Sequence, residues 1–240
     1  MEPIIYTENI NRIFKTGETE VHALKDVNIQ VNQGELLILR GRSGSGKTTL
    51  MNILSALDSP TSGKVFVQGK EITALPMAAR DELRRTEMSF IFQSVALMSQ
   101  MSAYENVEFG LRIAGYPAKD RRKRAEECLA MVGLKQRMHH RPAELSGGEQ
   151  QRVAIARAIA HHPKVLFADE PTAELDSAMG LQVMRLFREL VAKEGVTMVM
   201  TTHDPNMMEL ADHVYHIDDG AIIEETFHPD AAEMFKEVQP

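Results

Sequence analysis

The segment Leu36-Leu37-Ile38-Leu39-Arg40-Gly41-Arg42-Ser43-Gly44-Ser45-Gly46-Lys47-Thr48 combines a short apolar run with a glycine-rich loop that opens a helical pattern. The loop fits G-x-x-x-x-G-K-[ST], in which glycines let backbone N–H groups surround a phosphate chain while the next helix directs its positive end towards it. We therefore expect a nucleotide site, with Lys47 on the β- and γ-phosphates and the Thr48 hydroxyl on Mg²⁺. A chance match in a turn is the alternative, but the flanking strand and helix are what the chemistry requires. The residues expected to hold the phosphates are Gly41, Arg42, Ser43, Gly44, Ser45, Gly46, Lys47, Thr48 and Thr49.

Two carboxylates follow another apolar run, Val165–Ala168, and form the second candidate element of this site. The carboxyl ends of parallel strands form the crevice in which such folds bind ligands. Neighbouring residues of a strand point to opposite sides, so Asp169 and Glu170 can serve different targets. We expect Asp169 to bind Mg²⁺ and Glu170 to polarise the attacking water. Alone, an Asp-Glu pair is more often a helix N-terminal charge pair; the phosphate loop makes the catalytic interpretation strong.

Strand and helix patterns alternate along most of the chain, which predicts a mostly parallel sheet with helices on both faces. Strands are expected at Ile4–Asn9, Ala23–Val31, Leu36–Leu39, Lys64–Val67, Met88–Phe92, Val165–Ala168, Val196–Thr201 and Val214–Ile217, with a hairpin turn at Asn32-Gln33-Gly34. Helices are expected at Thr48–Leu57, Ala103–Ala114, Lys119–Val132, Gly148–Ala160, Ser177–Val191 and Pro205–Ala211, and the last dozen residues as a short helix or a frayed tail. We predict an α/β fold with a P-loop NTPase core (1–93 and 161–240), an N-terminal antiparallel β region and a helical insert (94–160).

The composition is that of a globular protein, with 43% hydrophobic and 25% charged residues. Lys and Arg number 27 against 34 Asp and Glu, and this net charge of −7 argues against a general nucleic-acid binder. The single cysteine, Cys128, cannot form an internal disulfide, and no Cys/His spacing fits zinc. We see neither a signal peptide nor an apolar run near the roughly 20 residues that span a bilayer, so we expect a cytosolic or peripheral protein.

Between the two candidate motifs lies Leu145-Ser146-Gly147-Gly148-Glu149-Gln150-Gln151-Arg152. Physically this is a second glycine-flanked helix N-terminus, and therefore a second candidate anion site. The segment resembles the signature sequence of ATP-binding-cassette ATPases, which P-loop proteins in general lack. In that family the signature of one subunit meets the phosphate loop of another. The resemblance implies a homodimer that closes on two ATP molecules, with Ser146, Gly147 and Gly148 contributed in trans.

Other positions match this family in order, from about Ile4 to Glu225. Gln93 resembles the glutamine-loop residue that contacts Mg²⁺, Asp176 the aspartate-loop residue that crosses the dimer interface, and His203 the switch histidine at the γ-phosphate. Phe14 stands where the family places an aromatic on adenine, with Tyr6 as the alternative. The resemblance thus implies catalytic roles for Glu170, His203, Gln93 and Lys47. Arg42 and Glu149 depart from commoner residues, but neither change removes a group that hydrolysis needs.

One subgroup resembles the chain best: the lipoprotein-release and macrolide- or peptide-export ATPases, on the segments Leu57–Gly63, Phe90–Gln93, Glu105–Val107 and Gln150–Ala158. Such subunits work with a separate integral membrane permease at the cytoplasmic face of the inner membrane. The resemblance therefore implies lipoprotein release, or export of or resistance to peptides, drugs or antimicrobials. The alternative is a non-transport ATPase that acts in DNA repair or translation. ATPases of that kind resemble proteins with long coiled-coil insertions or two fused cassettes, and this sequence shows neither feature. A regulatory module without turnover is the third reading, and Glu170 and His203 argue against it.

The segment from Ser94 to Phe109 is expected to dock the permease, because it leads from Gln93 into the helical insert. Its apolar residues are Val95, Ala96, Leu97, Met98, Met101 and Tyr104, several of which have no obvious core partner in the sequence pattern. The alternative is that they pack the insert against the core. Two further features are interpreted as solvated surface: the histidine pairs His139-His140 and His161-His162, and the basic run Lys119–Arg124.

Overall fold

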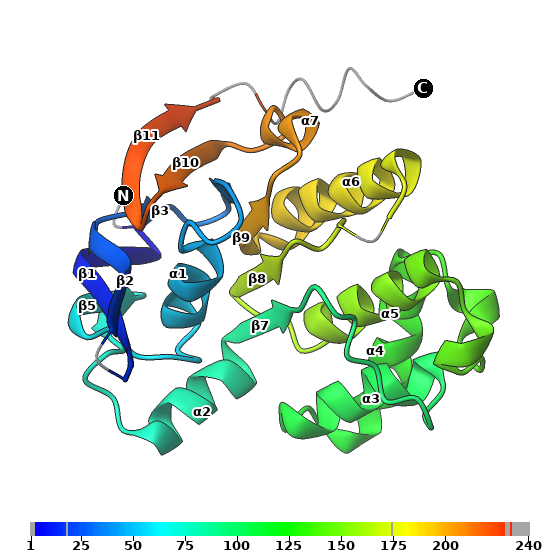
Figure 1. Ribbon diagram of the computed structural model, residues 1–240. Helices are drawn as coiled ribbons and strands as arrows, with labels where there is room; N and C mark the ends of the chain where they lie inside the picture. Colours follow the sequence, from blue (N-terminus) through cyan, green and yellow to red (C-terminus); the bar gives the residue numbers. More distant parts are fainter. Residues whose placement is uncertain (1–2, 18, 174, 229–230, 232–240) are drawn as a thin grey trace.

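The glycine-rich loop follows the third strand of a six-stranded sheet, ordered β11-β10-β4-β9-β8-β7, in the computed structural model of the chain (Figure 1). The structure describes residues 3–17, 19–173, 175–228 and 231. The strands are β4 (Leu36–Arg40), β7 (Met88–Ile91), β8 (Val165–Asp169), β9 (Thr197–Thr202), β10 (His213–Asp218) and β11 (Ala221–Phe227). Neighbouring strands are parallel except β10 and β11, which are antiparallel. The predicted mostly parallel sheet is confirmed.

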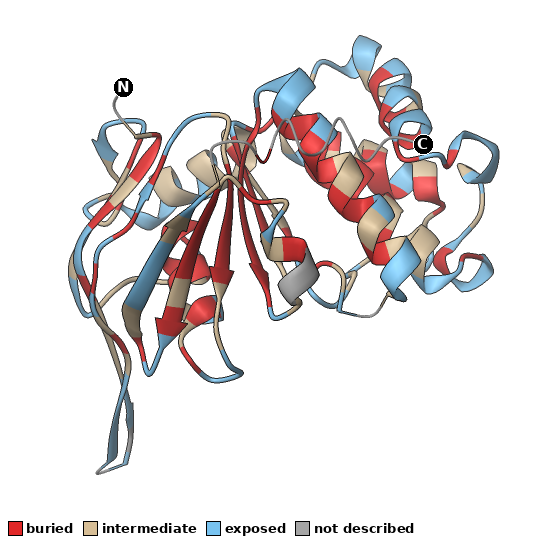
Figure 2. Cartoon of the chain, turned by 90° about the horizontal axis from the view of Figure 1, so that it is seen from above, coloured by how far each residue is buried: buried red, intermediate tan, exposed pale blue. Residues whose placement is uncertain are grey.

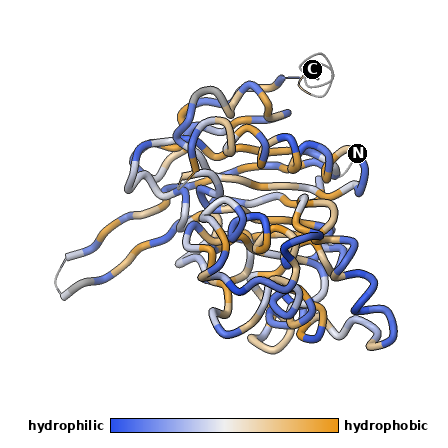
Figure 3. Tube along the Cα trace, turned by 90° about the vertical axis from the view of Figure 1, so that its right-hand side faces the viewer, coloured by the Kyte–Doolittle hydropathy of each residue, from blue (hydrophilic) through white to orange (hydrophobic). Residues whose placement is uncertain are grey.

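A second, antiparallel sheet is built from the N-terminal part of the chain. It contains β1 (Ile5–Thr16), β2 (Thr19–Val27), β3 (Gln30–Val31), β5 (Ser62–Val67) and β6 (Lys70–Glu71). β1 and β2 form a long hairpin that projects from the body of the molecule (Figures 2 and 3).

Three sequence predictions for this sheet are wrong. The strand predicted at Ile4–Asn9 continues to Thr16, because the projecting half of the hairpin is largely exposed and lacks a continuous apolar signal. The strand predicted at Ala23–Val31 comprises the end of β2 and β3, which are separated at residues 28–29. A turn does occur at Asn32-Gln33-Gly34, but it makes no hairpin. The strand before it pairs with β1, whereas the strand after it pairs with β9 and β10 in the other sheet.

Six of the seven α-helices in the described residues lie close to their predicted positions. The seven are α1 (Lys47–Leu54), α2 (Met77–Thr86), α3 (Ala103–Ile113), α4 (Ala118–Met131), α5 (Gly147–Ile159), α6 (Ser177–Glu194) and α7 (Pro205–Met208), with 3-10 turns at Lys135–Arg137 and Pro142–Glu144. α3, α4 and α5 pack against one another (Figure 1), within the predicted insert 94–160, whose boundaries stay a prediction. α2 was not predicted because it is strongly polar and contains no fully buried residue. The predicted C-terminal helix or tail lies almost entirely outside the described residues.

The central strands are buried on both faces, which fixes the strand ends where the site lies (Figure 2). Leu37 and Leu39 of β4 pack into a hydrophobic cluster with α1 and the antiparallel sheet, whereas Leu36 and Ile38 pack on the other face, in a cluster with α6. This alternation follows the two-residue period of a strand. Each fully buried leucine contributes about 1.5–3 kcal/mol through apolar burial.

Four residues are more buried than the sequence predicted. Leu97 and Tyr104 of the expected docking segment pack partly against the core, as the alternative interpretation of that segment predicts. Arg124 is buried because its guanidinium donates hydrogen bonds to the carbonyls of Ile159 and Ala160 at the end of α5. His161 is half-buried against the carbonyl of Met88, and this burial lowers its pKa.

Within the described residues, no helix is long and apolar enough to cross a membrane.

Candidate nucleotide-binding site

The loop Gly41–Gly46 connects the end of β4 to the N-terminus of α1. At Gly46 φ is +107°, and a Cβ there would lie 2.5 Å from the carbonyl oxygen of Ala23. At Gly41 a Cβ would lie 2.2 Å from the carbonyl oxygen of Ile217. Only glycine allows these close approaches, which press the loop against β2 and β10. Gly46 provides no side-chain cap for α1, so the first N–H groups of the helix remain available to an anion.

The Lys47 ammonium lies inside the curve of this loop. Its Nζ donates hydrogen bonds to the carbonyl oxygens of Gly41, at 2.8 Å, and Arg42, at 3.0 Å. Only 6% of Lys47 is exposed, so its positive charge is held in a fixed and largely desolvated position. A charge held in this way interacts more strongly with a phosphate than a mobile surface lysine does.

Asp169 ends β8 beside the phosphate loop. Its Oδ1 accepts hydrogen bonds from the Thr201 hydroxyl, at 2.6 Å, and from the Thr48 hydroxyl, at 3.3 Å. The Thr201 hydroxyl also accepts the backbone N–H of Glu170, at 2.8 Å. Thr201 is fully buried and thereby fixes both carboxylate-bearing residues. We did not predict a role for it, because a threonine on a buried strand is ordinary; the polar pair Thr201-Thr202 at the strand end was the only available signal.

Glu170 directly follows the last residue of β8, so the side-chain alternation expected for two neighbouring strand residues does not apply to it. Its backbone has a φ of +44°, a left-handed conformation that costs a non-glycine residue free energy and is concentrated at functional sites. Its Oε2 lies 3.3 Å from His203 Nδ1. The histidine is largely exposed, with 69% of its side chain accessible, so both side chains can be reached from solvent.

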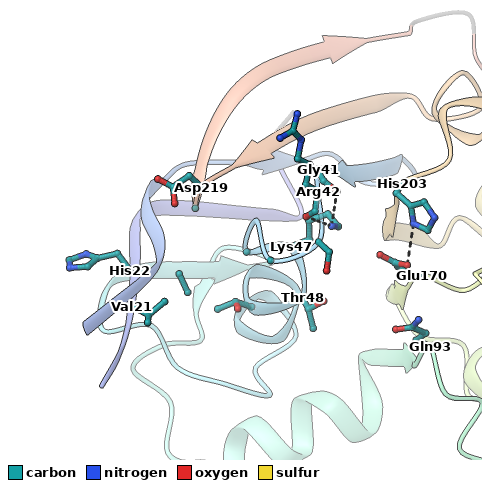
Figure 4. Close-up of a pocket in the computed structure, with 16 residues that line it drawn as sticks. Val21, His22, Gly41, Arg42, Lys47, Thr48, Gln93, Glu170, His203 and Asp219 are labelled. Carbon is teal, nitrogen blue, oxygen red and sulfur yellow. Dashed lines mark hydrogen bonds and ion pairs between the residues drawn. The ribbon is translucent and has the colours of Figure 1, made fainter. Parts of the chain in front are cut away.

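The phosphate loop, Lys47, Glu170 and His203 line one cavity of about 730 Å³, which is within the usual range for small-molecule sites (Figure 4). Asp169 lies outside this lining and touches it through the Thr48 hydroxyl. Glu170, His203 and Gln93 lie at one end, Lys47 and Thr48 lie centrally, and His22 and Asp219 lie at the other end. The lining residues are Val21, His22, Ala23, Gly41, Arg42, Ser43, Gly44, Gly46, Lys47, Thr48, Thr49, Gln93, Glu170, His203, Asp219 and Gly220. Ser45, also predicted to hold the phosphates, is buried and is not part of this lining. The contributions of Val21, His22, Ala23 and the β10–β11 turn were not predicted from the sequence.

Phe14 lies outside this lining but next to it. It pairs across the hairpin with Val21, which does line the cavity, and directly opposed residues share one face of a sheet. Tyr6, the alternative, stacks on Phe66 with ring centroids 4.4 Å apart and borders a different cavity with Pro3, Gln30 and Gly69. The structure therefore favours Phe14 over Tyr6 as the aromatic beside the site, and its contact with a base stays a prediction.

The signature segment starts α5. The Ser146 hydroxyl accepts the Glu149 N–H at 3.3 Å, and the Glu149 carboxylate accepts the Ser146 N–H at 2.8 Å, a reciprocal capping box that lowers the pKa of Glu149. Asp176 likewise caps α6 by accepting the Met179 N–H. Ser146, Gly147, Gly148 and Asp176 lie outside the lining of the cavity that holds Lys47. One chain thus does not bring the two predicted anion-binding loops together.

Comparison with known proteins agrees with this geometry. The family model described as "ABC transporter" matches residues 24–173. The macrolide export ATP-binding/permease protein MacB of Bartonella henselae is 47% identical over 92% of this chain, and the chain covers 34% of that relative. An uncharacterized ABC transporter ATP-binding protein of Thermotoga maritima is 44% identical over 92% of this chain and 94% of the relative. The chain thus spans about a third of the length of MacB.

A solved structure has the same fold as this chain. The ATP-binding cassette MJ0796, described as a dimer in a post-hydrolysis state bound to ADP and Pi, superposes with a TM-score of 0.86. It is 38% identical, and the match covers 93% of this chain and 98% of that one. A second structure of the same cassette, also described as a dimer, gives a TM-score of 0.87 at 39% identity.

Proposed function

The chain is an ATPase domain of the ABC transporter family, and we propose that it acts as the ATP-hydrolysing subunit of an exporter whose permease is a separate membrane protein. Lipoprotein release, or export of a peptide, drug or antimicrobial, is the proposed process. We place the subunit peripherally at the cytoplasmic face of the inner membrane. The macrolide-export name of the MacB relatives supports the export direction.

The observation that carries this proposal is the meeting of one fixed cation, the Glu170 carboxylate and a histidine around one cavity, with the Asp169 carboxylate held against Thr48 of its lining. Lys47, between the loop carbonyls, would hold the β- and γ-phosphates. Glu170 would polarise the attacking water, since its carboxylate is accessible from the cavity and does not compete with Asp169. His203, 3.3 Å from Glu170, would contact the γ-phosphate and orient that carboxylate.

The residues beside the loop fit Mg²⁺. The Thr48 hydroxyl and the Asp169 carboxylate are hard oxygen donors, and Mg²⁺ in nucleotide sites uses one or two such protein ligands together with phosphate oxygens and water. Gln93, at the same end of the cavity as Glu170, is proposed as a further contact. When bound, Mg²⁺ neutralises charge on the phosphates. The Thr201 hydroxyl keeps the Asp169 carboxylate turned towards this position.

The proposed subunit works as a homodimer. Ser146, Gly147, Gly148 and Asp176 would complete the site of the partner subunit, because they lie apart from Lys47 within one chain. The dimeric form described for the MJ0796 cassette supports this arrangement. The N-terminus of α5 would then offer the partner's ATP a second positive helix end.

The proposed permease-docking surface starts at Phe92 and follows the segment from Ser94 to Phe109. Phe92 and Met98 are exposed by 43% and 38%, which makes them its accessible apolar residues. Arg157 of α5 donates hydrogen bonds to the carbonyls of Val95 and Ala96, so a shift of this segment would be passed to the helix that starts with Ser146. Gln93 would connect the same segment to the nucleotide.

Two measurements test the proposal. Glu170→Gln should bind Mg·ATP with near-normal affinity and hydrolyse it very slowly, because the amide keeps the shape of the carboxylate but is a poor base. A variant with native turnover would assign the water-polarising role elsewhere.

For docking, the double substitution Phe92→Asp with Met98→Asp should leave folding and basal ATPase activity intact while the permease no longer co-purifies from membranes. These two residues are preferable to Leu97, which is partly packed in the core. Normal co-purification of the double variant would contradict the docking proposal.

A further inference from the structure

Arg12 lies outside the lining of the cavity, next to Phe14, whose cross-strand partner Val21 lines it, and the ATPase chemistry does not use this arginine. The centre of the Arg12 guanidinium lies over the ring of Phe14, 4.4 Å from the ring centroid. Arginine planes stack on aromatic faces through cation–π attraction and dispersion. One face of the Phe14 ring is therefore covered from within the chain, while 39% of the residue remains exposed.

Arg12 is itself held from the far side. Its Nη2 lies 3.0 Å from Asp58 Oδ1 and 2.8 Å from Oδ2, and the backbone N–H of Ser59 donates to the same carboxylate. The adjoining loop adds two more bonds to β1: the Thr61 hydroxyl accepts the Ile13 N–H, and the Thr61 N–H donates to the carbonyl of Asn11. The base of the hairpin is thus fastened to the loop that follows α1.

This fastening joins the two ends of the nucleotide site. α1 begins at Lys47, beside the phosphate position, and Asp58 lies just beyond the end of the same helix. Arg12 connects Asp58 to Phe14, whose cross-strand partner Val21 lines the cavity. α1 and the loop after it thus connect the phosphate loop to the strand that carries Phe14.

We propose that Arg12, anchored by Asp58, is a positioning residue that orients the Phe14 ring to stack on the base of the nucleotide. The inference rests on the proposed base-stacking role of Phe14. An isolated phenylalanine on an exposed hairpin would sample several rotamers, and ordering it on binding would weaken affinity. The guanidinium removes that freedom before the nucleotide arrives. If Arg12 served only to hold the hairpin, its ion pair with Asp58 would be enough, and the guanidinium would not need to cover the Phe14 ring.

The test compares ATP with inorganic tripolyphosphate, which has the phosphate chain but no base. Arg12→Met should weaken ATP binding by about threefold to tenfold, the size expected from a cation–π contact, and leave tripolyphosphate binding unchanged. Phe14→Ala should show the same selectivity, and combining both changes should weaken ATP no further than Phe14→Ala alone. Arg12→Lys keeps an ion pair with Asp58 but has no planar group, so its ATP affinity should lie between those of the wild type and Arg12→Met. This variant replaces Arg12→Met in the test if Arg12→Met does not fold. The matched control is Lys15→Met, which breaks the exposed Lys15–Glu20 pair on the same hairpin and should change neither affinity.

A spectroscopic reading is available because the chain contains no tryptophan. In Phe14→Trp the emission should change with ATP and not with tripolyphosphate, and adding Arg12→Met should reduce the change at saturating ATP. If Phe14→Ala weakens ATP binding while Arg12→Met does not, the positioning role is refuted and base stacking survives. If Arg12→Met weakens ATP and tripolyphosphate equally, Arg12 only supports the fold, and the inference is also wrong. If Phe14→Ala leaves ATP affinity unchanged, the stacking role fails and the inference falls with it.

Discussion

Thr201→Val is the change that best isolates how the site is held together. The Thr201 hydroxyl donates to Asp169 Oδ1 at 2.6 Å and accepts the Glu170 N–H at 2.8 Å, so one atom positions both carboxylates. Valine has the same shape without the hydroxyl. A hydrogen bond to a charged group contributes about 1.5–3 kcal/mol, and a buried N–H left without an acceptor costs about 1–3 kcal/mol. Together these lower the free energy of unfolding by roughly 2.5–6 kcal/mol, against about 5–15 kcal/mol for a typical domain.

Thr201→Val should reduce catalysis more than a substitution that lowers stability by the same amount at a position away from the site. Displacing Asp169 and Glu170 by a fraction of an ångström should reduce kcat by about tenfold to a hundredfold. The assay is steady-state phosphate release alongside urea unfolding. The matched control is Thr197→Val, since Thr197 is also fully buried in β9 and its hydroxyl accepts the Gly34 N–H at 3.0 Å, away from the site. That variant should lose stability and keep kcat, and Thr201→Ser should keep both. Equal kcat in Thr201→Val and Thr197→Val would refute the reasoning.

Lys47→Ala should abolish productive ATP binding, because the buried cation at the loop is lost; nucleotide titration checks this, and unchanged affinity and turnover would remove the phosphate-loop assignment. Ser146→Arg should prevent ATP-driven closure, and mixing it with Lys47→Ala should restore part of the hydrolysis, since a heterodimer has one site with neither change; ATP-driven dimerisation of Ser146→Arg would contradict this. Burial lowers the pKa of His213, so the folded chain binds this proton less readily than the unfolded chain, and the free energy of unfolding should fall as pH drops below about 6.5. Urea unfolding from pH 7.5 to 5.5 should show a smaller slope in His213→Asn, and an unchanged slope would exclude His213 as a source.

The sequence predicted the parts of the site that local spacing determines. The loop Gly41–Gly46 and the pair Asp169-Glu170 are recognisable because each chemical role needs fixed residue types between a strand and the next element. The cavity brings Lys47, Glu170, His203 and Gln93 together, although they are far apart in sequence. The parallel sheet could also be predicted from the sequence, because its strands are buried on both faces and therefore appear as continuous apolar runs.

The remainder depends on tertiary contacts that no local pattern contains. The exposed part of the β1–β2 hairpin has no apolar period, so its length and the contribution of Val21 and His22 were not foreseen. α2 is strongly polar and contains no fully buried residue, so no apolar run marks it in the sequence. Thr201 and Arg12 act through partners 32 and 46 residues away, Asp169 and Asp58, and only the folded chain identifies them.

The central claim is that two copies of this chain close around ATP and that Glu170 ends the closed state by promoting hydrolysis. The direct measurement is size-exclusion chromatography of Glu170→Gln with Mg·ATP and, in parallel, with Mg·ADP. We expect a dimer with ATP, because hydrolysis no longer releases the contacts between one subunit's phosphate loop and the partner's signature helix, and a monomer with ADP. A Glu170→Gln variant that binds ATP yet remains a monomer, or one that hydrolyses ATP at the native rate, would contradict the account.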